Sequence, residues 1–125
     1  METQMSNPTL QPSNTPTASP RHRALPIGVV TTCRMLLIIG GGIDTVARSR
    51  HATLFDWYRI RILLPEPKPE VTELAAKDPR FEVLYRLPTE DDIRWASVVV
   101  KDTGGFGENE TVTAWCREHR KLLNC

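Results

Sequence analysis

The chain has 125 residues, of which 40% are hydrophobic and 25% are charged, and its formal net charge at pH 7 is +1. This composition is typical of one soluble globular domain, and the balanced charge gives no electrostatic reason to expect nucleic acid or a membrane surface as a partner. No segment approaches the roughly 20 consecutive apolar residues that span a bilayer, and residues 1–24 lack the apolar centre of a secretory signal. We therefore expect a cytoplasmic protein.

Residues 1–24 are rich in Ser, Thr, Pro, Asn and Gln and contain almost no large apolar side chains. Such a segment cannot bury enough apolar surface to offset the entropy lost on ordering, so we predict a disordered tail followed by one domain over residues 25–125. The three cysteines, Cys33, Cys116 and Cys125, are widely spaced and form no Cys-x-x-Cys pair. This pattern favours small buried hydrophobic residues in a reducing compartment over a disulfide or a metal site.

The domain alternates predicted strands and helices, beginning with an apolar run over residues 33–39 that ends in three glycines. A short apolar run predicts a strand buried on both faces. The elements predicted after it are a helix over 45–58, a strand over 59–64, a helix over 70–77, a strand over 81–86, a turn capped by Thr89, a strand over 96–101, a helix over 109–120 and a strand over 121–125. This alternation predicts an α/β, Rossmann-like three-layer domain whose five-stranded parallel sheet has the order 3-2-1-4-5.

The glycines Gly40, Gly41 and Gly42 stand where the first strand meets the first helix. Glycines let the backbone turn sharply, and the N–H groups at the start of a helix can hold a pyrophosphate. In the predicted strand order they face residues 102–105 across one crevice, because ligands bind where the order reverses. The alternative interpretation is a tight turn that binds no ligand.

Glu66 follows the second predicted strand, about 20 residues after the glycines. In dinucleotide-binding domains an acid at this position binds a ribose hydroxyl, and it favours NAD over NADP because a carboxylate repels the 2′-phosphate. The alternative for Glu66 is a solvated acid in a loop between Pro65 and Pro67.

The other ionisable residues form no catalytic triad or metal-ligand set in the sequence. The histidines His22, His51 and His119 are scattered, and none lies near a cysteine or an acid at ligand spacing. Asp102, at the end of the fourth predicted strand, is either a general base or, more commonly for a lone acid before glycines, a turn former. No metal ion is expected.

Several segments of the sequence occur in the same order, and with nearly the same spacing, as in one known family. They are Leu25-Pro26-Ile27, Leu36-Leu37-Ile38-Ile39-Gly40-Gly41-Gly42, Val46-Ala47 with Arg48 and Arg50, Ile62-Leu63-Leu64-Pro65-Glu66, and Lys121-Leu122-Leu123-Asn124. Together they resemble the amino-terminal domain of siroheme synthase, over residues 25–125. That family comprises precorrin-2 dehydrogenases, many of which also act as sirohydrochlorin ferrochelatases.

The resemblance implies NAD-dependent oxidation of precorrin-2 to sirohydrochlorin, on the way to siroheme, by hydride transfer to the nicotinamide. It implies that the three glycines lie against the pyrophosphate, that Pro65 and Glu66 neighbour the adenosine ribose, and that Thr103 lies beside the nicotinamide. Asn109 matches the family's asparagine at the start of the next helix. The residues expected to bind the cofactor are Gly40, Gly41, Gly42, Ile43, Asp44, Thr45, Val46, Pro65, Glu66, Thr103 and Gly104.

The sequence departs from the family in two turns and at its end. Ile43-Asp44-Thr45 lengthens the glycine turn, and Gly104-Gly105 replaces an acidic pair. In the family, a strand ending like Leu123-Asn124 leads to the aspartate that acts as acid or base and then to a dimerisation domain and a helical domain. We therefore expect the catalytic residue beyond Cys125, and a homodimer or a partner chain that supplies the missing domains. The alternative is a non-catalytic module that binds a dinucleotide or a protein partner.

Overall fold

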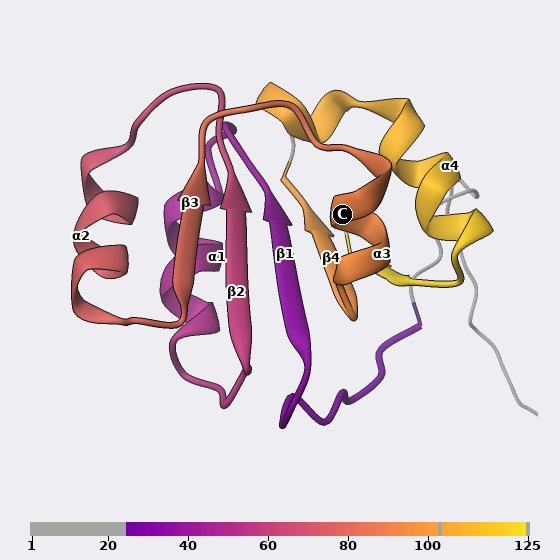
Figure 1. Cartoon of the computed structure of the whole chain (residues 1–125), viewed down its shortest axis with the longest axis horizontal. Helices are drawn as coiled ribbons and strands as arrows, with labels where there is room; N and C mark the ends of the chain where they lie inside the picture. Colours follow the sequence, from indigo (N-terminus) through magenta and orange to yellow (C-terminus); the bar gives the residue numbers. More distant parts are fainter. Residues whose placement is uncertain (1–24, 103, 125) are drawn as a thin grey trace, which may run out of the picture.

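The computed structural model describes residues 25–102 and 104–124. The predicted tail over residues 1–24 lies outside this part of the chain, as do Thr103 and Cys125. Strands and helices alternate along the described residues (Figure 1). The elements are β1 Met35–Ile39, α1 Thr45–Ala52, β2 Arg59–Leu63, α2 Pro69–Lys77, β3 Phe81–Leu84, α3 Glu90–Trp95, β4 Val98–Lys101, the 3-10 helix η2 Gly105–Glu108, α4 Glu110–Glu118 and β5 Leu122–Asn124.

The five strands form one parallel sheet with the order β3-β2-β1-β4-β5. This confirms the predicted Rossmann-like α/β fold and its strand order. β1 occupies the centre, where Ile38 is in register with Ile62 of β2 and Val100 of β4. A central parallel strand has neighbours on both edges and helices on both faces, which is why its sequence is an uninterrupted apolar run.

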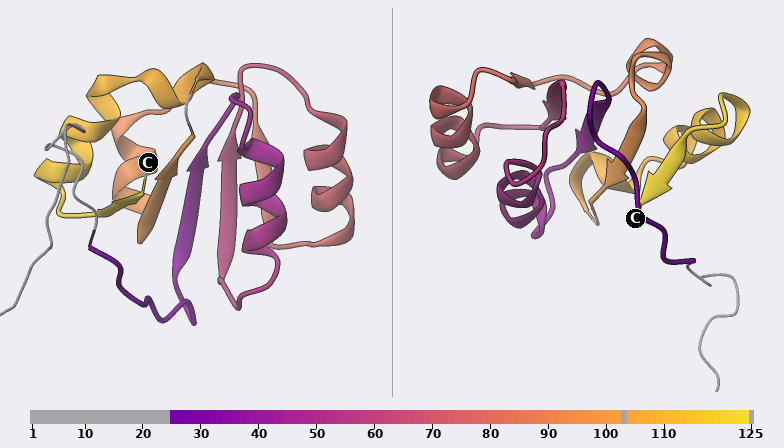
Figure 2. Two further views of the ribbon diagram at one scale, coloured as in Figure 1. Left: turned by 180° about the vertical axis from the view of Figure 1, so that it is seen from behind. Right: turned by 90° about the horizontal axis from the view of Figure 1, so that it is seen from below.

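The helices cover both faces of the sheet (Figure 2). A hydrophobic core lies on each face. Successive side chains of a strand point to opposite faces, so Leu36 and Ile38 join the core under α1 and α2, whereas Leu37 and Ile39 join the core under α3 and α4. These four side chains are at most 4% exposed. The apolar run that ends in the glycine turn is therefore anchored from both sides.

α1 ends at Ala52, so the helix predicted over 45–58 is too long. The last carbonyls of α1 accept hydrogen bonds in tighter turns. The Thr53 N–H donates to Arg50 O, and the Leu54 N–H donates to His51 O. The guanidinium group of Arg80, just before β3, then donates to carbonyls of residues 53–57. A distant arginine thus binds backbone acceptors of the segment that follows the helix.

Cys33 is exposed, which corrects the prediction that it is a buried hydrophobic residue. It has φ of 62° in a turn before β1, and the strand consequently begins at Met35 instead of Cys33. The turn is tied to the loop before β2, since the hydroxyls of Thr31 and Thr32 donate to the carboxylate of Asp56. Cys116, in contrast, is buried in the core under α3 and α4, as predicted.

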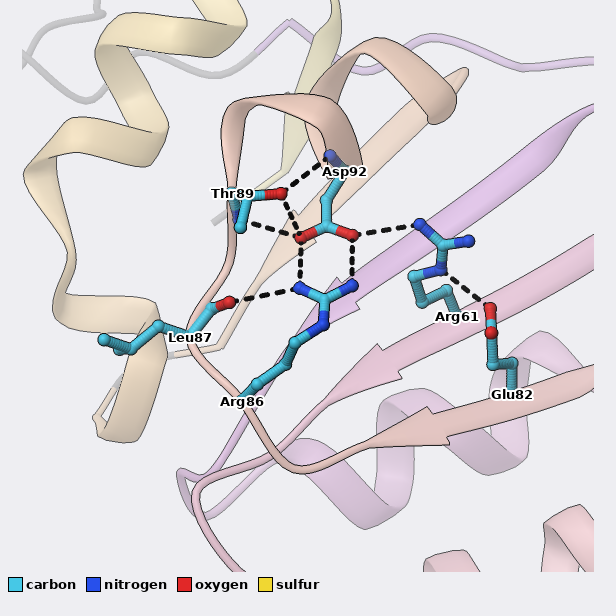
Figure 3. Close-up of polar contacts among 6 residues, drawn as sticks. All are labelled: Arg61, Glu82, Arg86, Leu87, Thr89 and Asp92. Carbon is cyan, nitrogen blue, oxygen red and sulfur yellow. Dashed lines mark hydrogen bonds and ion pairs between the residues drawn. The ribbon is translucent and has the colours of Figure 1, made fainter.

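A buried carboxylate, Asp92 of α3, fastens this helix to the loop after β3 and to the sheet (Figure 3). Arg86 donates to both Asp92 oxygens, at 2.7 and 2.9 Å, and Arg61 of β2 donates to one of them at 2.9 Å. The Thr89 backbone N–H also donates to Asp92, which completes a capping box at the start of α3. Burial alone would raise the pKa of Asp92, but the bonds from Arg86 and Thr89 outweigh it and lower the pKa from 3.8 to about 2.

Candidate dinucleotide site

The carboxyl ends of β1 and β4 lie side by side at the centre of the sheet, where the strand order reverses. α/β proteins bind ligands outside the carboxyl ends of the strands at such a reversal. The glycines Gly40, Gly41 and Gly42 follow β1, and Asp102 follows β4. The glycine turn therefore lies at the position of the sheet where a ligand is expected.

Gly41 is the residue on which the shape of this turn depends. Its φ is 111°, a conformation that residues with a Cβ rarely adopt, and a Cβ here would lie 2.7 Å from Cδ of Pro65. Pro65, in the loop that follows β2, thus packs directly against the glycine turn. Gly41 and Pro65, two of the residues predicted to bind the cofactor, are 24 positions apart in the sequence and neighbours in space.

The turn after β4 packs onto the glycine turn, which corrects the expectation that an open crevice separates them. The Phe106 N–H donates to Gly40 O at 3.0 Å. Gly105 has φ of 52°, and a Cβ on it would lie only 2.7 Å from Cα of Gly41. Because both turns are built from glycine, their backbones can come this close.

A buried hydrogen-bond chain joins the two turns from beneath. The Gly41 N–H donates to Thr45 Oγ1 at 2.9 Å, and the Thr45 hydroxyl donates to Asp102 Oδ2 at 2.5 Å. Thr45 is 0% exposed and Asp102 is 1% exposed. The other oxygen of Asp102, Oδ1, has no hydrogen-bond partner among the described residues. The sequence placed Thr45 in the site, but its pairing with Asp102 was not predicted.

The start of α1 faces the same region as the glycine turn. Its N-cap, Asp44, makes no side-chain hydrogen bond to the helix within the described residues, and the first turn carries no acidic side chain. Ile43 and Asp44 are exposed, whereas Val46 is half-buried and packs against the core under α1 and α2. The helix dipole and backbone N–H groups at this end suit an anion such as a pyrophosphate.

The remaining predicted residues are spread around this centre. Glu66 is exposed in the loop after β2, and Gly104 lies against the glycine turn, with its Cβ position 3.5 Å from Cα of Gly42. Thr103 lies outside the described residues. Asn109 caps α4, since its side chain accepts the Thr111 N–H at 2.9 Å.

One cluster of metal-ligand residue types lies elsewhere, on α3 and at the end of α4. Single ligand atoms of Glu90, Glu118 and His119 lie within 4.8 Å of one another. Sequence spacing gave no sign of it, because Glu90 and His119 are far apart in the chain. His119 Nε2 lies 2.7 Å from Glu90 Oε2, and Arg94 pairs with the same oxygen at 3.4 Å. Glu90 therefore already has partners, and the cluster links α3 to α4.

Among the described residues, the structure has no helix with the length and apolar character needed to cross a membrane.

A parallel 3-2-1-4-5 sheet with a glycine turn at its order reversal defines the class of Rossmann-like α/β domains. Residues 29–125 match a family model described as "Putative NAD(P)-binding". The chain belongs to this family, and the match supports the family resemblance drawn from the sequence.

Among solved structures, the chain is similar to one titled "SirC, precorrin-2 dehydrogenase", with a TM-score of 0.65 and 19% sequence identity. The match covers 82% of this chain and 49% of that chain. The present sequence therefore corresponds to about half the length of that protein, and the likeness at this identity is one of fold. A sequence search of curated proteins finds no match.

Proposed function

We propose that residues 25–125 form the NAD-binding domain of a precorrin-2 dehydrogenase, an oxidoreductase of siroheme biosynthesis. The observation that carries the proposal is the glycine turn at the centre of the sheet, against the uncapped start of α1. The family match and the fold shared with SirC support it. Further domains, from a homodimer or from a partner chain, would complete the binding site for the tetrapyrrole.

In this proposal each segment of the site binds one part of NAD. Gly40, Gly41 and Gly42, with the first N–H groups of α1, hold the pyrophosphate, and Ile43, Asp44 and Thr45 shape the turn around it. Pro65 and Glu66 neighbour the adenosine ribose, and Thr103 and Gly104 lie beside the nicotinamide. When bound, NAD⁺ would supply the hydride acceptor for the oxidation of precorrin-2 to sirohydrochlorin, with NADH and a proton as the other products. The residues named here bind and orient the cofactor.

The proposed site predicts that the full chain binds NAD and that Gly42→Glu weakens this binding at least about tenfold, because the new carboxylate meets the pyrophosphate. Calorimetric titration with NAD measures both affinities. Gly28→Glu is the matched control, since it adds the same side chain where nothing lies within 4 Å. A folded wild-type chain that binds no NAD would contradict the proposal. Wild-type affinity for NAD in Gly42→Glu would also contradict it.

Glu66 provides a separate test of which dinucleotide is bound. Its carboxylate is exposed in the loop after β2, where it would repel the 2′-phosphate of NADP. We expect Glu66→Gln to narrow the preference for NAD over NADP by about tenfold, measured as the ratio of the two dissociation constants. Glu70→Gln removes an exposed charge from α2 nearby in the chain and should leave the ratio unchanged. An unchanged ratio in Glu66→Gln would assign Glu66 to the solvated loop instead.

A further inference from the structure

Asp102 is a carboxylate that the fold keeps away from solvent at some cost. It is 1% exposed, its Oδ2 accepts the Thr45 hydroxyl, and its Oδ1 has no partner among the described residues. A buried charge is unfavourable unless the groups around it compensate for the lost water. Its position under the paired turns also removes it from contact with a substrate, which argues against the general-base alternative.

Thr45, the hydrogen-bond partner of Asp102, connects this carboxylate to the glycine turn. Thr45 is the first residue of α1, and its Oγ1 receives the Gly41 N–H while donating to Asp102. The hydroxyl thus uses both of its hydrogen-bonding functions, one on each turn. The Asp102 backbone is fixed in turn, because its N–H donates to Ile39 O at 2.9 Å in the extension of the β1–β4 ladder.

We infer that Asp102 is a positioning residue that holds the glycine turn in its binding conformation through Thr45, without touching the dinucleotide. Gly41 has φ of 111°, a conformation that an isolated chain has no strong reason to retain. The hydrogen bonds from Gly41 through Thr45 to Asp102 stabilise this conformation, since they fix the direction of the Gly41 N–H. The inference rests on the proposed function, because the consequence of fixing this turn is a higher affinity for NAD.

We call Gly41, Thr45 and Asp102 the latch. Four variants distinguish an effect of the latch on NAD binding from a general loss of stability. Thr45→Val and Asp102→Ala break the chain, whereas Thr45→Ser and Asp102→Asn keep a hydroxyl and an acceptor oxygen. We expect the first two to raise the dissociation constant of NAD about tenfold and the other two to change it less than about threefold. The double variant Thr45→Val with Asp102→Ala should lose no more NAD affinity than either single variant. Ser49→Ala is the stability control, since it removes another buried hydroxyl of α1, bonded to Thr45 O at 2.7 Å.

Amide hydrogen exchange at Gly41, measured without NAD, gives a second readout that does not depend on the ligand. Its amide should exchange slowly in the wild type and in Thr45→Ser and at least about tenfold faster in Thr45→Val. Equal exchange in all three, or equal NAD affinity in Thr45→Val and the wild type, would overturn the latch. A wild type with a protected Gly41 amide and no affinity for NAD would instead overturn the proposed function, and with it the role of the latch in binding.

Discussion

Replacing Asp92 with alanine is expected to lower the free energy of unfolding by about 3 kcal/mol. The Asp92 side chain is 1% exposed and compensates two arginines at once, Arg86 and Arg61. Its loss leaves Arg61, whose side chain is 18% exposed, without this partner, and it removes the reciprocal bond of the capping box at Thr89. Urea unfolding followed by circular dichroism measures the change.

The same carboxylate predicts how stability depends on pH. Since the pKa of Asp92 falls from 3.8 to about 2 on folding, the folded state gains stability above the unfolded pKa and loses it as the pH falls between about 4 and 2. The shift corresponds to roughly 2 kcal/mol. In Asp92→Asn this contribution is absent, so the wild type and the variant should converge in stability toward pH 2.

Asp91, its neighbour on α3, is the matched control for both measurements. Its side chain is 87% exposed and pairs with Arg94, an arrangement that contributes less than about 1 kcal/mol. We expect Asp91→Ala to unfold close to the wild type. A comparable loss in Asp91→Ala and Asp92→Ala would show that the buried pairs with Arg86 and Arg61 are not the source of the stability.

Gly105→Ala is expected to cost both stability and NAD affinity. The new Cβ would lie 2.7 Å from Cα and 2.8 Å from C of Gly41, and both of these atoms belong to backbone that cannot rotate away. The left-handed φ of 52° adds a conformational cost. Together these effects lower the free energy of unfolding by about 3 kcal/mol. The two turns must also separate, which displaces the glycine turn from the geometry proposed for the pyrophosphate.

Thermal unfolding and calorimetric titration with NAD test the two parts of this prediction. Gly28→Ala provides the control, because a Cβ there meets nothing within 4 Å. We expect it to behave like the wild type in both assays. If Gly105→Ala also unfolded and bound like the wild type, the close contact between Gly105 and Gly41 would not exist in solution.

The strand order could be predicted because it depends on patterns that are local in sequence. An apolar run such as 33–39 can be buried on both faces only at the centre of a sheet, and parallel strands need the helical crossovers that the chain supplies. Local sequence also predicts the strands that contain Val98-Val99-Val100 and Arg59-Ile60-Arg61-Ile62. The glycine turn followed from its place after the first strand.

The interactions between distant residues could not be predicted in the same way. Arg80 binds the loop after α1, and the buried pair of Thr45 and Asp102 joins residues at the ends of two different elements. The contact of Gly41 with Gly105 depends on the path of a turn for which a run of glycines sets no single conformation. Each of these features requires the folded sheet to bring its members together.

Arg80 donates hydrogen bonds to main-chain oxygens of the loop between α1 and β2. Its guanidinium group is oriented by Asp78, at 2.8 Å, and it donates to the carbonyls of Phe55 and Trp57 at 2.6 and 3.2 Å. Every residue type carries such a carbonyl, so these bonds place few demands on the side chains of the loop. The path of the loop thus depends on a position before β3 as well as on the loop's own side chains, of which Asp56 accepts the hydroxyls of Thr31 and Thr32 and Trp57 is buried in the core under α1 and α2.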